Sequence, residues 1–387
     1  MIRRPISYGR QSIDDKDIEA VVATMKSDFL TQGPKIREFE EKFAGYVGAK
    51  YAVAVNNATS GLHIAAKALG VKEGDNVIVT AMTFAASANC VRYCGGNVHF
   101  CDIDPKTYLM DIEKLRGILE SHPAGYFKGV IVVDFAGYPL DLEEYRKVCD
   151  AYGLWLIEDA CHAPGGWFTD SAGNRQRCGN GKFADCSVFS FHPVKHITTG
   201  EGGMVTTNNR EIYERLRLFH THGITKNPES LHKNDGGWYY EQQELGFNCR
   251  LTDIQAALGI SQLAKADKGL ARRQEIARRY DEAFGKDDRI RIPYRAEGIF
   301  HAFHLYIIQV EDRKGLYDRL HEAGIYAQVH YVPLHLMPYY SELGSREGDC
   351  PVAEEYYRHC LSLPMYPTLT DEEQDYVIEK VLGSVGG

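Results

Sequence analysis

The sequence predicts an α/β protein with a large domain over residues 1–265 and a smaller α+β domain over residues 266–387. Short β-rich runs alternate with helical periodicity through the first two thirds of the chain, which is the pattern of βαβ units around a mostly parallel central sheet. Most of these runs are continuously apolar, as expected of strands that are covered on both faces. Beyond residue 284 the pattern changes to a strand, a helix and another strand.

The first elements are two amphipathic helices. Ile18, Val21, Val22 and Met25 share one helical face, and Ser12 with Asp15 three residues later resembles a capping box. A second helix is expected through residues 36–46. Six strands are then expected, at 51–55, 77–80, 130–135, 154–157, 187–191 and 204–207.

Near the middle of the chain lies a polar stretch, 169–182, that we expect to form a surface loop or hairpin. A helical pattern runs almost unbroken over 252–284 and joins the two domains. In the smaller domain we expect strands at 302–310 and 327–331 and a helix at 316–323.

Composition narrows the class of protein. The net charge of −9 disfavours a nucleic-acid partner, and no apolar run reaches the 18 residues of a membrane span. The N-terminal stretch becomes acidic where a signal peptide would be apolar, so we expect a cytoplasmic protein with reduced thiols. The ten cysteines form no cluster with zinc spacing, and we expect no metal.

Four features fall at the carboxyl ends of expected strands, where open α/β sheets bind their ligands. The first is Asn57-Ala58-Thr59-Ser60-Gly61, between a strand and an Ala-rich helix. Small residues and free helix-terminal N–H groups can hold an anion such as a phosphate. Simple capping of the helix explains the same residues equally well.

The second feature is Asp159, at the end of an apolar strand, with His162 three residues later. A buried carboxylate is costly unless it pairs with a cation, and a protonated pyridine nitrogen would be such a partner. Alternatively, Asp159 caps a following helix, and His162 is a packed core histidine.

The third feature is Lys195, which follows a strand ending at Ser190 and precedes a Thr/Gly-rich loop. A lysine whose pKa is lowered by burial reacts with carbonyl groups through its neutral amine. The alternative is an ordinary surface lysine, but a surface loop seldom follows so apolar a stretch of sequence.

The fourth feature is Asn248 with Arg250, ahead of the long helical stretch. Both side chains could serve an anion. Capping of the helix by Thr252 is the alternative.

Taken in this order, these residues resemble the sugar aminotransferases of the DegT/DnrJ/EryC1/StrS family, and the block FSFHPVKHITTGEGGMVTT is highly specific for it. The resemblance covers essentially the whole chain. It implies the fold type I of pyridoxal-phosphate (PLP) enzymes, PLP as cofactor and a homodimer with shared active sites. Within the family, SDFLTQGP, LGFNCRLTDIQAALGISQL and AQVHYVPLH are most similar to the branch of pseudaminic acid biosynthesis.

The resemblance also implies residue roles. Lys195 would carry PLP and move the proton, Asp159 would pair with the ring nitrogen, and His162 would lie near the ring hydroxyl. The remaining cofactor contacts would come from Ala58, Thr59, Ser60, Phe84 and Ser190, and from Asn248 acting on the neighbouring subunit's cofactor. The sugar-nucleotide pocket would be lined by Tyr8, Asp28, Phe29, Leu30, Thr31, Arg250, His330 and Tyr331.

The reaction that the resemblance implies is transfer of the amino group of L-glutamate to C4 of a UDP-linked 4-keto-6-deoxy-N-acetylhexosamine. The nearer alternative is another nucleotide 4-keto sugar, either a UDP-4-ketopentose or a dTDP-4-keto-6-deoxyhexose. The farther alternative is a non-catalytic regulator, which would be expected to lack Lys195 or its partners.

Overall fold

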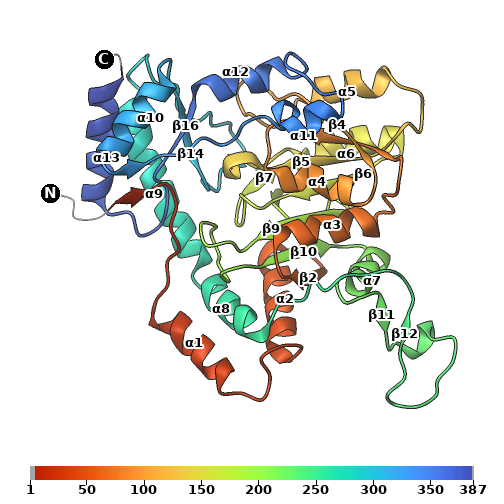
Figure 1. Ribbon diagram of the computed structural model, residues 1–387. Helices are drawn as coiled ribbons and strands as arrows, with labels where there is room; N and C mark the ends of the chain where they lie inside the picture. Colours follow the sequence, from red (N-terminus) through yellow and green to blue (C-terminus); the bar gives the residue numbers. More distant parts are fainter. Residues whose placement is uncertain (1–4, 386–387) are drawn as a thin grey trace.

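The computed structural model describes residues 5–385, and its centre is a seven-stranded sheet (Figure 1). The spatial order of the strands is β2 (Tyr51–Val55), β10 (Gly203–Thr207), β9 (Cys186–Ser190), β6 (Trp155–Asp159), β5 (Phe127–Val133), β3 (Asn76–Thr80) and β4 (Asn97–Cys101). From β9 to β4 all neighbours are parallel, whereas β10 is antiparallel to both β9 and β2. A mostly parallel sheet is therefore confirmed.

Helices cover both faces of this sheet. One face packs against α3 (Ala58–Ala68), α4 (Ala85–Tyr93) and α7 (Arg210–Phe219). The other packs against α5 (Ile112–Glu120) and α6 (Leu142–Tyr152), and towards β2 against α2 (Pro34–Val47) and α8 (Asp253–Leu263). Alternate residues of one strand serve opposite faces, so Val53 faces α3 while Ala52 faces α2. Burial on both faces explains why the strands are continuously apolar.

A second core is formed mainly by the C-terminal third of the chain. In it, α9 (Ala266–Phe284), α10 (Arg313–Glu322) and α13 (Asp371–Ser384) pack around the antiparallel pair β14 (Tyr306–Gln309) and β16 (Cys360–Leu363). The N-terminal strand β1 (Ile6–Ser7) joins this core through parallel pairing with β15 (Ile325–Tyr326). Conversely, α12 (Pro351–His359) and the short α11 (Pro338–Glu342) pack against the large sheet unit. The domain boundary at residue 265 remains a prediction. A segment before it packs into the C-terminal core, and segments after it pack into the sheet unit.

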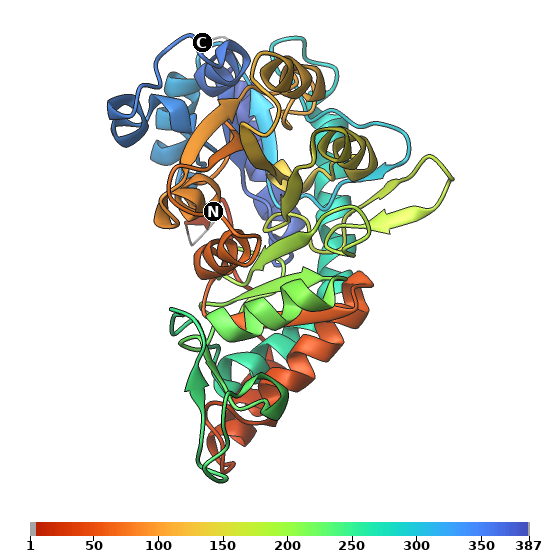
Figure 2. The same cartoon turned by 90° about the vertical axis from the view of Figure 1, so that its right-hand side faces the viewer.

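Two hairpins project from the sheet unit, as Figures 1 and 2 show. The first joins β7 (Trp167–Thr169) to β8 (Arg175–Arg177), confirming the loop or hairpin expected at 169–182, and β13 (Ile299–Phe300) extends it. The second, between β11 (Ile224–Thr225) and β12 (Glu241–Gln242), forms an arm on which the Trp238 side chain is 75% exposed.

All six expected strands of the sheet are present within a few residues, but three other expectations were wrong in detail and one strand was missed. The helix expected over 252–284 is interrupted at Ala264 and Lys265, and the Lys265 ammonium pairs with Asp14 and Asp17. The cap of α1 (Asp15–Met25) is Asp14 with Asp17, not Ser12 with Asp15. The strand expected at 327–331 is replaced by irregular chain that follows β15. The edge strand β4 was missed because its residues are not uniformly apolar.

Helix α1 turns its apolar face outward. Ile18 and Met25 are 54% and 60% exposed, while the polar Asp17 and Thr24 are buried against α8 and its surroundings. Figure 1 shows α1 at the edge of the molecule, beside α8. Within residues 5–385, no helix has the length and apolarity needed to cross a bilayer.

Candidate active site

A cavity of about 830 Å³ opens at the carboxyl ends of β2, β6 and β9, between the sheet unit and the C-terminal core. It gathers residues that are far apart in the chain. Eleven of the residues singled out from the sequence line it: Tyr8, Ala58, Thr59, Ser60, Phe84, Asp159, His162, Ser190, Lys195, His330 and Tyr331.

The first turn of α3 forms one wall of this cavity. Asn57 caps the helix, its side-chain oxygen accepting a 2.8 Å hydrogen bond from the Ser60 amide, so the capping explanation is correct for Asn57. Ala58 and Thr59 nevertheless line the cavity. Close packing fixes this turn, because a Cβ on Gly203 would lie 2.8 Å from the Ala58 amide nitrogen. A tightly held helix N-terminus is suited to binding an anion.

Asp159 lies at the end of β6 with only 5% of its surface exposed. One carboxylate oxygen accepts a 2.6 Å hydrogen bond from the Ser87 hydroxyl, and the other accepts from the Cys161 amide at 3.2 Å. No helix follows Asp159; the chain turns instead, so the helix-cap alternative is wrong. A buried carboxylate held this way can pair with a cationic ligand group in the cavity.

Lys195 lies in the loop between β9 and β10 and points its amine into the same space. Burial lowers the pKa of Lys195, whereas the thiol of Cys161 and the carboxylate of Asp159 raise it by a smaller amount. The Nζ atom lies 3.4 Å from Nε2 of His304. Lys195 is therefore no surface lysine, and its environment favours the neutral, nucleophilic amine.

His162 is buried and its Nδ1 accepts a 3.2 Å hydrogen bond from the Ala136 amide. The proton of the neutral ring must therefore reside on Nε2, which lies 3.3 Å from the Tyr331 hydroxyl. Burial lowers the pKa of His162 well below its usual value, so the ring is neutral and offers one N–H donor. His162 is both packed and able to donate to a ligand.

Aromatic side chains form the mouth of the cavity. Phe84, 60% exposed, faces Tyr331 with ring centroids 6.1 Å apart. Tyr8, which follows β1, packs on His330 at 5.1 Å, and His330 Nδ1 lies 2.8 Å from the Ser362 hydroxyl. Residues from the N-terminus and from the C-terminal core therefore close the cavity opposite Lys195.

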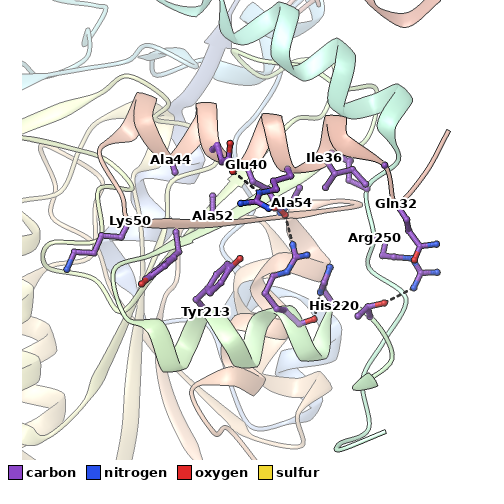
Figure 3. A pocket seen from close by; sticks show the side chains of 17 residues that line it. Gln32, Ile36, Glu40, Ala44, Lys50, Ala52, Ala54, Tyr213, His220 and Arg250 are labelled. Atoms are coloured by element: carbon purple, nitrogen blue, oxygen red, sulfur yellow. Dashed lines mark hydrogen bonds and ion pairs between the residues drawn. The ribbon is translucent and has the colours of Figure 1, made fainter. Parts of the chain in front are cut away.

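Six predicted site residues lie elsewhere. Asn248 pairs with Thr221, and the Arg250 guanidinium donates to the Thr221 hydroxyl at 2.9 Å. Arg250 lines a separate hollow of about 600 Å³ between α2, β2 and α7, where Figure 3 shows it near Gln32. Neither hollow is lined by the other four residues, Asp28, Phe29, Leu30 and Thr31. Thr252 caps α8, as the alternative explanation of the Asn248 and Arg250 feature predicted.

The cavity of the same chain is therefore not lined by Asp28, Phe29, Leu30, Thr31 or Arg250, and their assignment to the sugar pocket stays a prediction. The segment 28–31 is held instead at the start of α8, where the Leu30 carbonyl accepts from the Asp253 amide and Thr31 pairs with Thr252.

Several residues of the site were missed. One is Ser87, which lies on α4 one helical turn after Phe84 and has no distinguishing signal in the sequence. His304 was hidden in the expected strand 302–310, whose irregular first half carries it to Lys195. Only spatial proximity identifies these two side chains, because neither belongs to a local motif.

Residues 11–382 match the DegT/DnrJ/EryC1/StrS aminotransferase family. The chain belongs to this family. It is 37% identical over 379 residues to the UDP-4-amino-4,6-dideoxy-N-acetyl-beta-L-altrosamine transaminase of Campylobacter jejuni, covering 96% of this chain and 95% of the relative. The structure of Helicobacter pylori PseC, an aminotransferase involved in the biosynthesis of pseudoaminic acid, matches with a TM-score of 0.89 and 30% identity, covering 99% of each chain. The PLP form of Spr1654 from Streptococcus pneumoniae matches with a TM-score of 0.87 and 31% identity over 97% of each chain.

The protein is thus a PLP-dependent sugar aminotransferase with the type I fold. Its cavity fits the cofactor: the first turn of α3 suits the phosphate, Asp159 suits a protonated ring nitrogen, and Lys195 suits the aldehyde. When bound, PLP supplies a carbonyl that exchanges with amines and a ring that accepts an electron pair. The chain would supply position and charge: Asp159 would hold the positive ring nitrogen, and Lys195 Nζ could take up and return a proton.

Proposed function

We propose that this aminotransferase moves the amino group of L-glutamate to C4 of a UDP-linked 4-keto-6-deoxy-N-acetylhexosamine. The product would be UDP-4-amino-4,6-dideoxy-N-acetyl-β-L-altrosamine. The observation that carries the choice of sugar is the 37% identity, over nearly the whole chain, to a transaminase named for this product. The aromatic mouth supports a sugar ring as ligand, because Tyr8 and Tyr331 offer faces to its apolar side.

The experiment that tests the sugar uses a panel of nucleotide-4-keto sugars with glutamate, with products identified by mass and NMR. We expect the UDP-linked 4-keto-N-acetyl hexose to have the highest kcat/KM. Removing its N-acetyl group should cost about 1–3 kcal/mol of transition-state binding, typical of a lost buried hydrogen-bonded group. Equal kcat/KM for a dTDP-linked 4-keto hexose would reject this sugar and favour another nucleotide sugar, while leaving the aminotransferase intact.

We propose that Lys195 is the lysine that carries the cofactor. Borohydride reduction of the loaded enzyme, followed by peptide mass analysis, should fix PLP to Lys195. Lys195→Ala should abolish this attachment, whereas Lys72→Ala, which removes an exposed lysine elsewhere, should leave it unchanged. Fixation to another lysine in the unaltered protein would contradict the assignment. The retained Lys195 and Asp159 favour an enzyme over a regulator.

We further propose a homodimer in which each chain completes its partner's site. Asn248, Arg250 and the segment 28–31 line no part of their own cofactor cavity, so a second copy is the way in which they can serve one. The outward apolar residues Ile18, Met25 and Phe29, the last 52% exposed, offer a surface that a second copy would bury. The exposed Trp238 on the β11–β12 arm is a further contact of this kind.

Subunit mixing tests the shared site. Lys195→Ala and Asn248→Ala proteins should each be poorly active, and mixed dimers should recover part of the activity, because one of their two sites is intact. Sedimentation should show a dimer for both variants. An active monomer, or no recovery after verified subunit exchange, would contradict action of Asn248 across the interface.

A further inference from the structure

A group of imidazoles surrounds the amine of Lys195 on the side of the C-terminal core. His304, only 4% exposed, approaches Nζ with its Nε2 at 3.4 Å. Its ring also packs on His162, with centroids 4.3 Å apart, and lies 5.8 Å from the ring of His196. His304 therefore touches the reactive amine directly while lying beside the histidine assigned to the ring hydroxyl.

A buried arginine holds the main chain around His304 in place. Arg273, on α9 and 1% exposed, donates from Nη1 to the carbonyl oxygens of Phe303, His304 and Met365 at 2.9–3.2 Å. The Leu305 amide donates to the Ala136 carbonyl at 3.1 Å, and the amide of Ala136 in turn holds His162. One backbone connection thus fixes both imidazoles relative to the sheet unit.

Burial and the neighbouring positive charges keep the ring of His304 neutral. Burial lowers the pKa of His304 well below its usual value, and the positive charges of Lys195 and Arg273 and the rings of His162 and His196 act in the same direction. Its Nδ1 meets no hydrogen-bonding partner among residues 5–385, so the contact at Nε2 is the polar contact that its ring makes. A neutral imidazole of this kind can accept one hydrogen bond from an ammonium.

The amine of Lys195 needs such an acceptor. Burial and Arg273 lower the pKa of Lys195 and favour the neutral amine, whereas Asp159 and the thiol of Cys161 favour the ammonium. His162 and His330 also face this amine, and both are kept neutral by burial. Asp159 already accepts from Ser87 and the Cys161 amide and is the partner proposed for the ring nitrogen. An ammonium buried without an acceptor is costly.

We propose that His304 is a positioning residue that holds the free amine of Lys195 and accepts a hydrogen bond at Nε2 while that amine carries the transferred proton. The inference rests on the proposed role of Lys195. In the proton transfer, the lone pair of Nζ would form an N–H bond as the C–H bond of the carbon bearing the amino group breaks, and the cofactor ring would take up the electron pair of that C–H bond. An N–H bond of the ammonium would then break as its proton passes to the carbon on the other side of the transferred nitrogen. The electron pair returning from the ring would form the new C–H bond, so no other reactant is needed.

The test measures the amine itself in cofactor-free protein. Trinitrobenzenesulfonate labels neutral amines, so the pH dependence of labelling at Lys195, read by peptide mass analysis, gives the pKa of Lys195. Because the hydrogen bond stabilises the ammonium, His304→Phe should lower the labelling midpoint by about one to two pH units. His304→Gln, whose amide oxygen can replace Nε2, should restore the midpoint to within about half a unit of the unaltered protein.

The matched control is His301→Gln. His301 is also a buried histidine, three residues away, but its Nδ1 accepts from the Phe303 amide and it does not contact Lys195. This control should leave the midpoint unchanged. If the phenylalanine variant does not fold, His304→Asn, whose shorter side chain cannot span the distance, should show the lowered midpoint when compared with His304→Gln.

A second readout is single-turnover reaction of the loaded enzyme with glutamate. His304→Phe should slow proton transfer about tenfold to a hundredfold with little change in KM, and should increase the isotope effect of α-deuterated glutamate. An unchanged or raised labelling midpoint in His304→Phe would overturn the proposal. Failure of borohydride to fix PLP on Lys195 would instead overturn the assignment of the lysine, so the two failures are distinguishable.

Discussion

The close approach of β10 to the first turn of α3 predicts an effect of a single methyl group on cofactor binding. A Cβ on Gly203 would lie 2.8 Å from the Ala58 nitrogen and 2.9 Å from both the Asn57 carbonyl carbon and the Phe189 carbonyl oxygen. All three are backbone atoms, so Gly203→Ala has to displace the turn by roughly half an ångström, and such overpacking costs about 1–3 kcal/mol. The displaced turn is the one that we assign to the phosphate of PLP.

Two measurements separate the effects of this substitution. Urea unfolding of cofactor-free protein should show the loss of stability, and titration should show about tenfold weaker binding of PLP but unaltered binding of pyridoxal, which lacks the phosphate. The control is Gly117→Ala on α5, where a Cβ meets nothing within 4 Å and should add about 0.5–1 kcal/mol of stability. Equal PLP affinities for Gly203→Ala and the unaltered protein would refute the reasoning.

Three further substitutions test the buried charges. Ser87→Ala removes the hydroxyl that donates to Asp159 and should lower the free energy of unfolding by about 1.5–3 kcal/mol in denaturant titrations, and no loss would mean that Asp159 needs no such support. Asp159→Asn should fold but turn over at least about a hundredfold more slowly in steady-state assays, because a neutral amide cannot keep the ring nitrogen protonated. Burial and then the charge of Glu158 raise the pKa of Asp134 well above its usual value, so Asp134 takes up a proton on folding and its contribution to stability falls as pH rises. Asp134→Asn should therefore gain stability relative to the unaltered protein as pH rises above the ordinary pKa of an aspartate, and parallel pH profiles of unfolding would contradict this.

The sequence predicts best those features that local patterns encode. Buried strands such as β2 are continuously apolar, and residues such as Lys195 and Asp159 stand at strand ends, so their convergence at one edge of the sheet follows from parallel topology. Local patterns do not encode the contacts made at the break at Lys265, because the ion pairs there join Asp14 and Asp17, which lie about 250 positions earlier in the chain.

The sequence also leaves open which subunit a residue serves. Asn248 and Lys195 are equally prominent in the sequence, yet the fold places only Lys195 in the cavity of its own chain. The same limit applies to α1, whose apolar face predicts burial but lies outward in a single chain. The contact between His304 and Lys195 joins two cores and depends on how they dock, which periodicity cannot show.

The antiparallel strand β10 has a consequence for motion at the site. Because β9 and β10 are neighbours, Ser190 and Gly203 lie opposite each other at the two ends of the loop that carries Lys195. One residue further into this loop, the Phe191 amide donates a hydrogen bond to the Gly202 carbonyl. The loop with Lys195 is therefore anchored at both of its ends by main-chain pairing within the central sheet. In the role proposed for Lys195, its amine has to reach different atoms during each turnover, and rotation about its own four-carbon side chain can supply that travel without movement of the main chain.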